Sequence, residues 1–217
     1  MTETIETEVD ADGTRLGCFL GVPDRARGLV VFAHGSGSSR FSSRNRAVAD
    51  HLVAAGFATA LFDLLTAEEH EEDLRTRAHR FDIPLLARRL GGAVRWTRTR
   101  PDIASLPVGL FGASTGAAAA LIAAAGEPEI VQAVVSRGGR PDLADAALEQ
   151  VRCPVLLIVG GADTDVLDLN RRASGRLRQS PVELEVVEGA SHLFEEPGAL
   201  EEVERLAADW FAAHLRA

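Results

Sequence analysis

Short apolar runs alternate with segments of helical spacing along most of the chain. We interpret the apolar runs as strands at 15–22, 28–33, 57–63, 107–112, 130–136, 154–159 and 182–187. The segments between them repeat apolar residues at helical spacing over 42–55, 83–99, 115–125, 142–150, 166–179 and 199–215. Strands that are apolar on both sides need cover on both faces. The alternation therefore predicts an α/β fold, with a mostly parallel twisted sheet and helices on both faces.

The stretch 66–80 departs from this alternation because it is crowded with charge. Its acidic residues follow in close succession: Glu68, Glu69, Glu71, Glu72 and Asp73. Such a stretch is either a short lid over a site or an exposed, solvated face. The chain otherwise shows no repeat, no low-complexity linker and no long insertion. Its 217 residues then suit a single domain over 1–217 without a large cap domain.

The composition argues against several classes of protein. Hydrophobic residues make up 46% and charged residues 25%, which is ordinary for a soluble folded protein. A net charge of −9 argues against nucleic-acid binding, which usually needs a basic face. No apolar run approaches the roughly 20 residues of a membrane helix. The acidic, polar start MTETIETEVD is unlike a secretory signal. We therefore expect a cytoplasmic protein that binds neither nucleic acid nor membranes.

Cysteine usage agrees with that expectation. Cys18 and Cys153 are far apart in sequence, and each has apolar, strand-like neighbours. We interpret them as reduced, buried thiols. No Cys/His spacing resembles a zinc site, and we expect neither a metal nor a cofactor.

The candidate chemistry begins at Gly112-Ala113-Ser114-Thr115-Gly116, between a predicted strand and a predicted helix. This is the G-x-S-x-G pattern of a nucleophile elbow in its required context. The glycines two residues before and two residues after the serine would let the strand and the helix approach each other closely, where a side chain would clash. The alternative is that Ser114 only caps the helix. If it is a nucleophile, it needs an imidazole base and a carboxylate that orients the imidazole.

His192 and Asp163 are the candidates for these two roles. His192 follows the strand 182–187 in a loop before the final helix, where a base would lie in such a sheet. Asp163 and Asp165 both follow the strand 154–159, and we favour Asp163 because Asp165 could cap the next helix. The chain order serine, acid, histidine is the order of the α/β-hydrolase arrangement.

An oxyanion hole should complete such a site. The backbone N–H of Thr115, directly after the serine, is one expected donor. The second should come from the loop His34-Gly35-Ser36-Gly37 after the strand 28–33. We assign it to the N–H of Ser36, with Gly37 as the alternative. A phosphate-loop lysine pattern is absent, which argues against a nucleotide ligand.

These motifs resemble the dienelactone hydrolase-like branch of the α/β-hydrolase superfamily. The resemblance is carried from about Val30 to Val203 by stretches that include VVFAHGSGSSR, PVGLFGASTGAAAAL, LLIVGGADTDVLDLN and GASHLFEEPGALEEV. It implies a nucleophile at Ser114, an acid at Asp163 and a base at His192. Typical members use a cysteine nucleophile, so the serine here supports the fold and triad more than a dienelactone substrate. Some relatives occur beside or fused to a phosphoribosyltransferase-like domain, which makes such a domain a candidate partner, and a homodimer is a further open arrangement.

The stretch SRGGRPD, which is also a distinctive feature of similar proteins, contains two candidate anion-binding residues. Arg137 and Arg140 follow the strand 130–136, and their guanidinium groups could hold a substrate carboxylate. The alternative is that they pair with Asp142 or with other surface acids. His34 and Gly35 of the glycine-serine loop complete the candidate substrate-binding set.

The leading hypothesis is a serine hydrolase that cleaves a carboxylic ester, lactone or thioester of a small-molecule acyl substrate. The same acyl-enzyme would also serve an acyltransferase or cyclase, because only the acceptor differs. A non-catalytic binding module on a hydrolase fold is the third hypothesis, because fold alone does not determine function.

Overall fold

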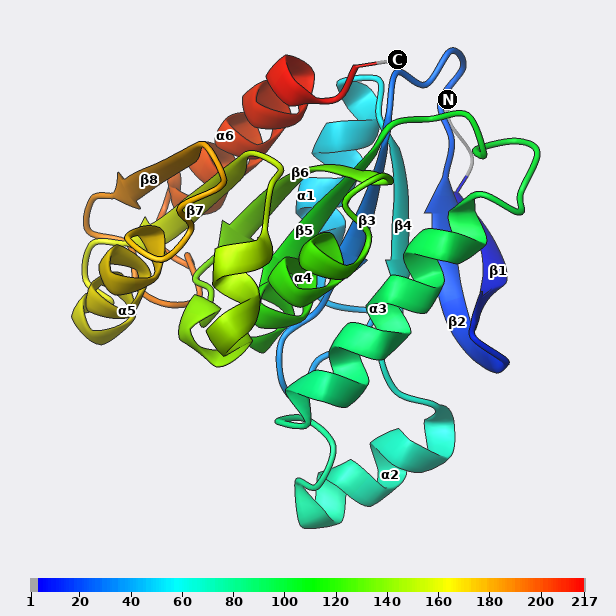
Figure 1. Ribbon diagram of the computed structural model, residues 1–217, viewed down its shortest axis with the longest axis horizontal. Helices are drawn as coiled ribbons and strands as arrows, with labels where there is room; N and C mark the ends of the chain where they lie inside the picture. The colour runs from blue at the N-terminus through cyan, green and yellow to red at the C-terminus, as the bar shows by residue number, and fades with distance from the viewer. Residues whose placement is uncertain (1–3, 217) are drawn as a thin grey trace.

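The computed structural model describes residues 4–216, which build one eight-stranded sheet (Figure 1). The strands in chain order are β1 (Thr4–Ala11), β2 (Thr14–Gly21), β3 (Leu29–Ala33), β4 (Ala58–Phe62), β5 (Val108–Ala113), β6 (Val131–Arg137), β7 (Val155–Gly160) and β8 (Val182–Val187). Their order across the sheet is β1-β2-β4-β3-β5-β6-β7-β8. The pairs β1–β2 and β2–β4 are antiparallel, and the remaining pairs are parallel. The predicted α/β fold with a mostly parallel sheet is confirmed.

Helices cover both faces of the sheet. They are α1 (Ser43–Ala54), α2 (Ala67–Thr76), α3 (Ile83–Thr97), α4 (Thr115–Gly126), the 3₁₀ segment η1 (Pro141–Gln150), α5 (Thr164–Ser174) and α6 (Ala199–His214). One face is covered by α1 and α6, and the other by α3, α4, η1 and α5 (Figure 1). Within the described residues, the longest connection between strands runs from β4 to β5 and holds α2 and α3, so no large cap domain is inserted.

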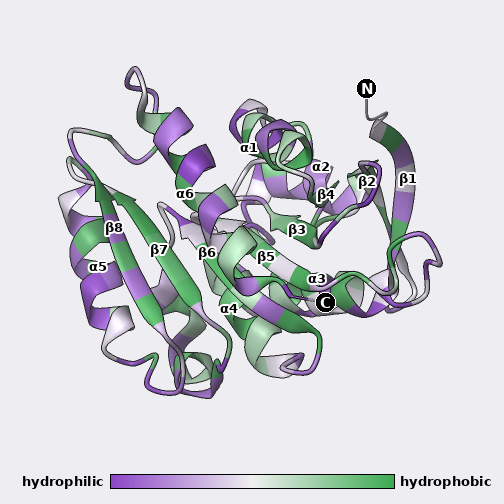
Figure 2. Cartoon of the chain, turned by 90° about the horizontal axis from the view of Figure 1, so that it is seen from above, coloured by the Kyte–Doolittle hydropathy of each residue, from purple (hydrophilic) through white to green (hydrophobic). Residues whose placement is uncertain are grey.

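Burial differs between the centre and the edges of the sheet. Every residue of β3, β4, β5 and β7 is buried, because helices pack on both of their faces. The edge strand β8 alternates between half-buried and exposed positions. Figure 2 shows the apolar colour running along β7, while polar positions interrupt β1. Across residues 4–216, no helix has the length and apolar character to span a membrane.

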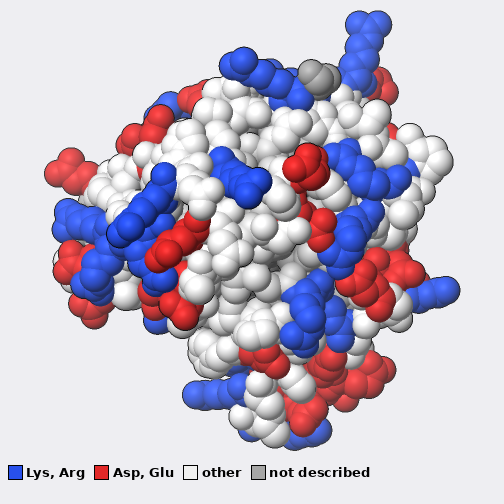
Figure 3. Space-filling model, viewed as in Figure 1, with Lys and Arg blue, Asp and Glu red and all other residues white. Residues whose placement is uncertain are grey.

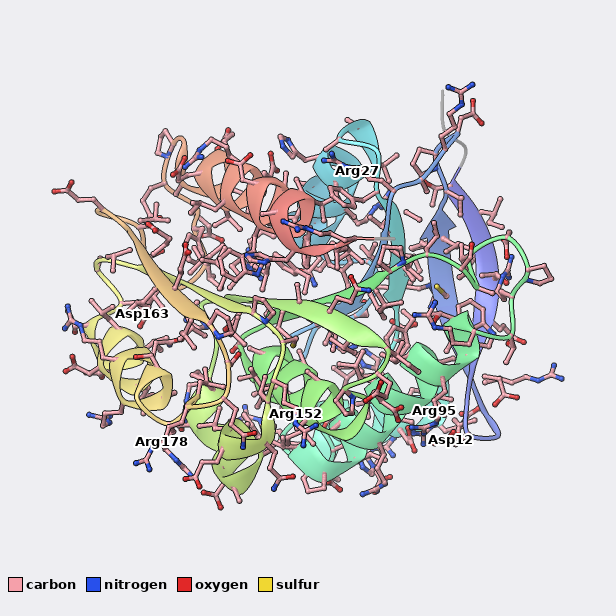
Figure 4. All side chains as sticks on the ribbon, turned by 45° about the horizontal axis from the view of Figure 1, so that its top comes forward. Asp12, Arg27, Arg95, Arg152, Asp163 and Arg178 are labelled. Atoms are coloured by element: carbon pink, nitrogen blue, oxygen red, sulfur yellow. The ribbon has the colours of Figure 1, made fainter. Side chains whose placement is uncertain are left out.

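The N-terminal strand β1 was not predicted. It pairs with β2 as a hairpin around Asp12 and Gly13, both at positive φ, and the Gly13 N–H donates to Asp10 Oδ1 at 2.6 Å. Only one face of β1 is buried, at Val9 and Ala11, so its pattern lacks the continuous apolar run of the central strands. An Asp-Gly pair after alternating residues is the hairpin signal that identifies it. The ion pair of Arg95 with Asp12 fastens the hairpin to α3 (Figure 4).

Two of the predicted helices differ from those that the structure shows. The segment predicted as a helix over 142–150 forms 3₁₀ turns over Pro141–Gln150, interrupted where Asp145 has φ 42°. The helix predicted over 166–179 is α5, which begins earlier, at Thr164, and ends at Ser174. The helix predicted over 42–55 ends as expected, with Gly56 at φ 87° after its last turn.

The charged stretch 66–80 contains a helix, α2. Thr66 and Glu69 form a capping box at its start, each side chain accepting a hydrogen bond from the other's backbone N–H. Asp73 is 1% exposed and accepts hydrogen bonds from the backbone N–H groups of His79 and Arg80 and from Arg80 Nε. The stretch is therefore anchored by a buried carboxylate rather than being only a solvated face. Figure 3 shows acidic and arginine side chains intermixed over this end of the molecule.

Candidate active site

Ser114 occupies the turn between β5 and α4, at the carboxyl end of a central strand. Its backbone has φ 51° and ψ −119°, a strained conformation for a residue with a side chain. Three hydrogen bonds hold the turn: the Ser114 N–H donates to the Arg137 carbonyl at 3.2 Å, and the Ser114 carbonyl accepts from Ala117 and Arg140. Its side chain makes no capping hydrogen bond to α4. Ser114 thus stands at the N-cap position of α4 without capping the helix through its side chain, and its strained turn is the conformation expected of a nucleophile elbow.

The two flanking glycines are required by close backbone contacts. A methyl group on Gly112 would lie 2.7 Å from the Ala117 nitrogen. One on Gly116 would lie 2.6 Å from the His34 carbonyl oxygen and still closer to that of Ala33. Both approaches are shorter than any ordinary carbon contact, and backbone atoms cannot rotate away. The glycines therefore allow β3, β5 and α4 to meet around the serine, as the pattern predicts.

The loop after β3 lies directly against the serine. A methyl group on Gly35 would be 3.2 Å from Ser114 Cβ. Among residues 4–216, the backbone N–H groups of Ser36, Gly37 and Thr115 donate no hydrogen bond within the protein. The predicted oxyanion donors therefore have no hydrogen-bond partner among the described residues, and the geometry leaves both Ser36 and Gly37 open for the second position.

His34 holds this loop in place. Its Nε2 accepts a hydrogen bond from the Leu64 N–H at 3.0 Å, so Nδ1 carries the proton and donates to the Gly35 carbonyl at 3.0 Å. Burial lowers the pKa of His34 below its ordinary value of 6.5, which favours the neutral ring. Both ring nitrogens are thus engaged by backbone, and the side chain does not line the cavity of Ser114 described below.

His192 and Asp163 meet in space, although they come from different connections. His192 Nδ1 lies 2.6 Å from Asp163 Oδ2, and because a carboxylate only accepts, the ring donates. Asp163 stands immediately before α5 (Figure 4), and Asp165 is exposed in the first turn of that helix. A methyl group on Gly160 would lie 2.6 Å from the Ser191 carbonyl oxygen, so this glycine lets the histidine loop approach β7.

A cavity of about 220 Å³ joins these elements. Ser36, Ser114 and His192 all line it, together with Arg137 and the start of α1. A larger hollow of about 640 Å³ lies between the β1–β2 hairpin and the start of α2, and Ser114 does not line it. The smaller cavity is the one with the candidate chemistry. Across residues 4–216, no group of three or more His, Cys, Asp or Glu side chains converges as a metal site would require.

The two candidate arginines have different surroundings. Arg140 forms a bidentate ion pair with Asp142, at 2.9 and 2.8 Å, and does not line the cavity. Arg137 is 7% exposed and lines it. Its Nη2 reaches Asn45 Oδ1 at 3.4 Å, while Nε and Nη1 have no partner among the described residues. Burial, and the nearby Arg44 charge, lower the pKa of Arg137 to about 10.

The start of α1 was not among the predicted site residues. Ser42, Arg44 and Asn45 line the cavity, and Ser42 Oγ accepts a hydrogen bond from the Asn45 N–H at 3.3 Å. The sequence signal that could have identified this part of the site is Ser42, a helix-capping serine directly after the glycine-serine loop.

Both cysteines are free thiols. Cys18 is buried and Cys153 is half-buried.

Residues 16–216 match the family model described as the dienelactone hydrolase family. The chain belongs to the dienelactone hydrolase family. The crystal structure of a dienelactone hydrolase from Anabaena variabilis is 56% identical, with a TM-score of 0.97 over 99% of both chains. The structure of Est1E from Butyrivibrio proteoclasticus, 17% identical with a TM-score of 0.77 over 96% of this chain and 98% of its own, shares the fold.

Curated relatives of this dienelactone hydrolase family member are longer than the chain itself. Two proteins from strains of Mycobacterium tuberculosis, each described as a putative phosphoribosyl transferase, are 59% identical over 210 residues. The match covers 97% of this chain but 46% of each relative, so the chain spans about half their length.

Proposed function

We propose that this α/β-hydrolase cleaves a carboxylic ester, lactone or thioester through an acyl-enzyme on Ser114. The observation that carries the proposal is the 2.6 Å hydrogen bond between His192 and Asp163, with His192 and Ser114 on one cavity. With Nδ1 donating to the carboxylate, Nε2 of His192 is the nitrogen left to accept a proton. Asp163 then fixes the tautomer and stabilises the imidazolium that forms.

The reaction proceeds in two halves. Ser114 Oγ attacks the carbonyl carbon while His192 Nε2 takes the hydroxyl proton, and the carbonyl electron pair moves onto oxygen. When the tetrahedral intermediate collapses, His192 returns the proton to the leaving alcohol or thiol, and the acyl group stays on Ser114. Water then attacks the ester with His192 as base, which frees the acid and restores the serine.

Charge on the carbonyl oxygen is stabilised by the N–H of Thr115 and one N–H of the loop after β3. A single such donor contributes about 2.7–4 kcal/mol in other enzymes. The start of α4 adds its partial positive charge to the same place. The strained turn at Ser114 and the loop held by His34 keep these donors in position before substrate binds.

The test is hydrolysis of p-nitrophenyl acetate and butyrate by Ser114→Ala. We expect kcat/KM to fall by about 10⁴-fold or more and labelling by a fluorophosphonate to disappear. Ser174→Ala is the matched control, because within residues 4–216 that hydroxyl bonds only the Arg171 carbonyl on α5, and its loss should leave both readouts unchanged. If the Ser114→Ala protein keeps full turnover, the proposal is wrong.

The remaining predictions concern partners and location. The length and description of the mycobacterial relatives support association with a phosphoribosyltransferase-like domain, which stays a prediction. The cytoplasmic location, the single domain over residues 1–217 and the homodimer also stay predictions.

A further inference from the structure

The cavity beside Ser114 is basic, although the chain as a whole is acidic. Its charged lining side chains are Arg44 and Arg137, and no carboxylate lines it among the described residues. The net charge of the whole protein is −9. Arg44 has one acidic partner, Glu195, at 3.2 Å, and that carboxylate is largely exposed. The second guanidinium, Arg137, has none among residues 4–216.

The contacts that Arg137 does make are too weak to satisfy its charge. Its hydrogen bond to Asn45 spans 3.4 Å, longer than an ordinary N–H···O bond. Its guanidinium carbon lies 6.0 Å from the Phe194 ring centre, at the outer limit of a cation–π contact. Buried charges in proteins are normally paired, so a buried guanidinium whose nitrogens Nε and Nη1 have no partner among the described residues is suited to binding an anion.

Further donors surround the same space. Arg44 Nε is also buried without a partner. The backbone N–H group of Arg44, in the first turn of α1, donates no hydrogen bond within the described residues, and Arg44 lines the cavity. The hydroxyls of Ser36, Ser38 and Ser42 belong to residues of the lining. A helix start alone would not make a site, but here it adjoins a buried, unpartnered guanidinium.

We propose that this cluster, made of Arg137, Arg44 and the first turn of α1, binds a phosphate group carried by the substrate of Ser114. Glu195 formally balances one of the two guanidinium charges, but this carboxylate is largely exposed and solvent screens it, so the charge of the buried pair is only partly balanced. A phosphate monoester carries about −1.5 to −2 at neutral pH, whereas a carboxylate carries one charge. Three phosphate oxygens also use more of the available donors than the two oxygens of a carboxylate. The assignment rests on the proposed hydrolase function, because it names the substrate class of that site.

Binding of inorganic phosphate can be measured without catalysis. In the full chain carrying Ser114→Ala, we expect calorimetric titration with inorganic phosphate at constant ionic strength to show saturable binding. Adding Arg137→Met should weaken that binding about 10-fold or more, since one charge-assisted bidentate contact is lost. Arg46→Met makes the same charge change two residues from Arg44 on exposed helix surface, and should alter the affinity by less than about 2-fold. Equal effects of the two substitutions, or no binding at all, would overturn the phosphate site.

Substrate selection provides the second measurement. We compare p-nitrophenyl esters of 3-phosphonopropanoate, succinate and butyrate, in which the acyl chain ends in phosphonate, carboxylate or methyl. The wild-type kcat/KM should be about 30-fold higher for the phosphonate ester than for butyrate, with succinate between them, and Arg137→Met should reduce that preference at least 10-fold. A succinate ester that equals or exceeds the phosphonate ester would overturn the assignment to phosphate. If no ester is cleaved but phosphate binding still depends on Arg137, the hydrolase proposal fails and the anion site stands.

Discussion

Replacing Gly116 by alanine would introduce a methyl group where two backbone carbonyls already lie. The added carbon would be 2.6 Å from the His34 oxygen and closer still to the Ala33 oxygen. Both oxygens belong to the end of β3 and to the loop proposed to provide an oxyanion donor. Because neither can rotate out of the way, α4 and that loop must separate.

The magnitude follows from the distances. Carbon and carbonyl oxygen approach to about 3.3 Å at closest in ordinary packing, so relief of the His34 contact alone needs a shift of about 0.7 Å. Overpacking of this kind costs about 1–3 kcal/mol of folding stability. A misplacement of about 1 Å in a catalytic arrangement costs about 10²-fold in rate. We therefore expect Gly116→Ala to reduce kcat/KM by about 10- to 100-fold and to lower the free energy of unfolding.

Gly126→Ala is the matched control, at the other end of the same helix. A methyl group there meets no atom within 4 Å, so the only effect is better helix propensity, about 0.5–1 kcal/mol in favour of folding. Urea unfolding and hydrolysis of p-nitrophenyl acetate measure the two variants side by side. If Gly116→Ala matches Gly126→Ala in stability and turnover, the close approach around Ser114 does not exist as described.

The other predictions test the acid and the loop histidine. Asp163→Asn should lower kcat/KM for p-nitrophenyl acetate by about 10⁴-fold, because it removes the carboxylate that accepts the hydrogen bond of His192. Asp165→Asn, on the exposed first turn of α5, should change kcat/KM by less than about 3-fold. Equal losses in the two variants would contradict the assignment of Asp163 as the acid. Burial lowers the pKa of His34 in the folded state, so the unfolded chain binds its proton more readily. The stability that His34 contributes is complete above about pH 6.5 and is lost as the pH falls towards its lower folded pKa, with a slope of at most about 1.4 kcal/mol per pH unit. In urea unfolding between pH 7.5 and 5, His34→Asn should flatten this dependence, and an unchanged slope would refute the explanation.

The central part of the fold could be predicted because each buried strand carries its own signal. Continuous apolar runs such as those of β3 and β7 are required when helices cover both faces, and they are visible without neighbours. The edge strand β1 buries one face only, and its exposed Thr and Glu positions hide it from a search for apolar runs. Likewise α2 buries Asp73 rather than an apolar stripe, so its sequence shows charge and not periodicity.

The site could be predicted in its residue types but not in its contacts. The choice between Asp163 and Asp165 depends on where the loop after β8 lies relative to the end of β7, a register that sequence alone does not fix. The same is true of Arg137 and Arg140, which come from one short stretch. One is buried against the start of α1, while the other pairs with Asp142 two residues away. They lie three residues apart, and what separates them is that Arg137, at the end of β6, reaches Asn45 at the start of α1.

Backbone contacts at glycines and side chains at the cavity have different roles in this molecule. Gly116 presses against the carbonyls at the end of β3, and Gly160 presses against those of the loop that carries His192. The segments that hold Ser114, the proposed oxyanion donors and His192 are therefore fixed to the sheet by main-chain atoms, which side-chain substitution leaves in place. Arg137 and Arg44 are not fixed in this way, since each has at least one buried guanidinium nitrogen with no partner among the described residues. Substitutions at the two arginines should therefore change which acyl group is accepted, while substitutions at the glycines should change the reaction itself.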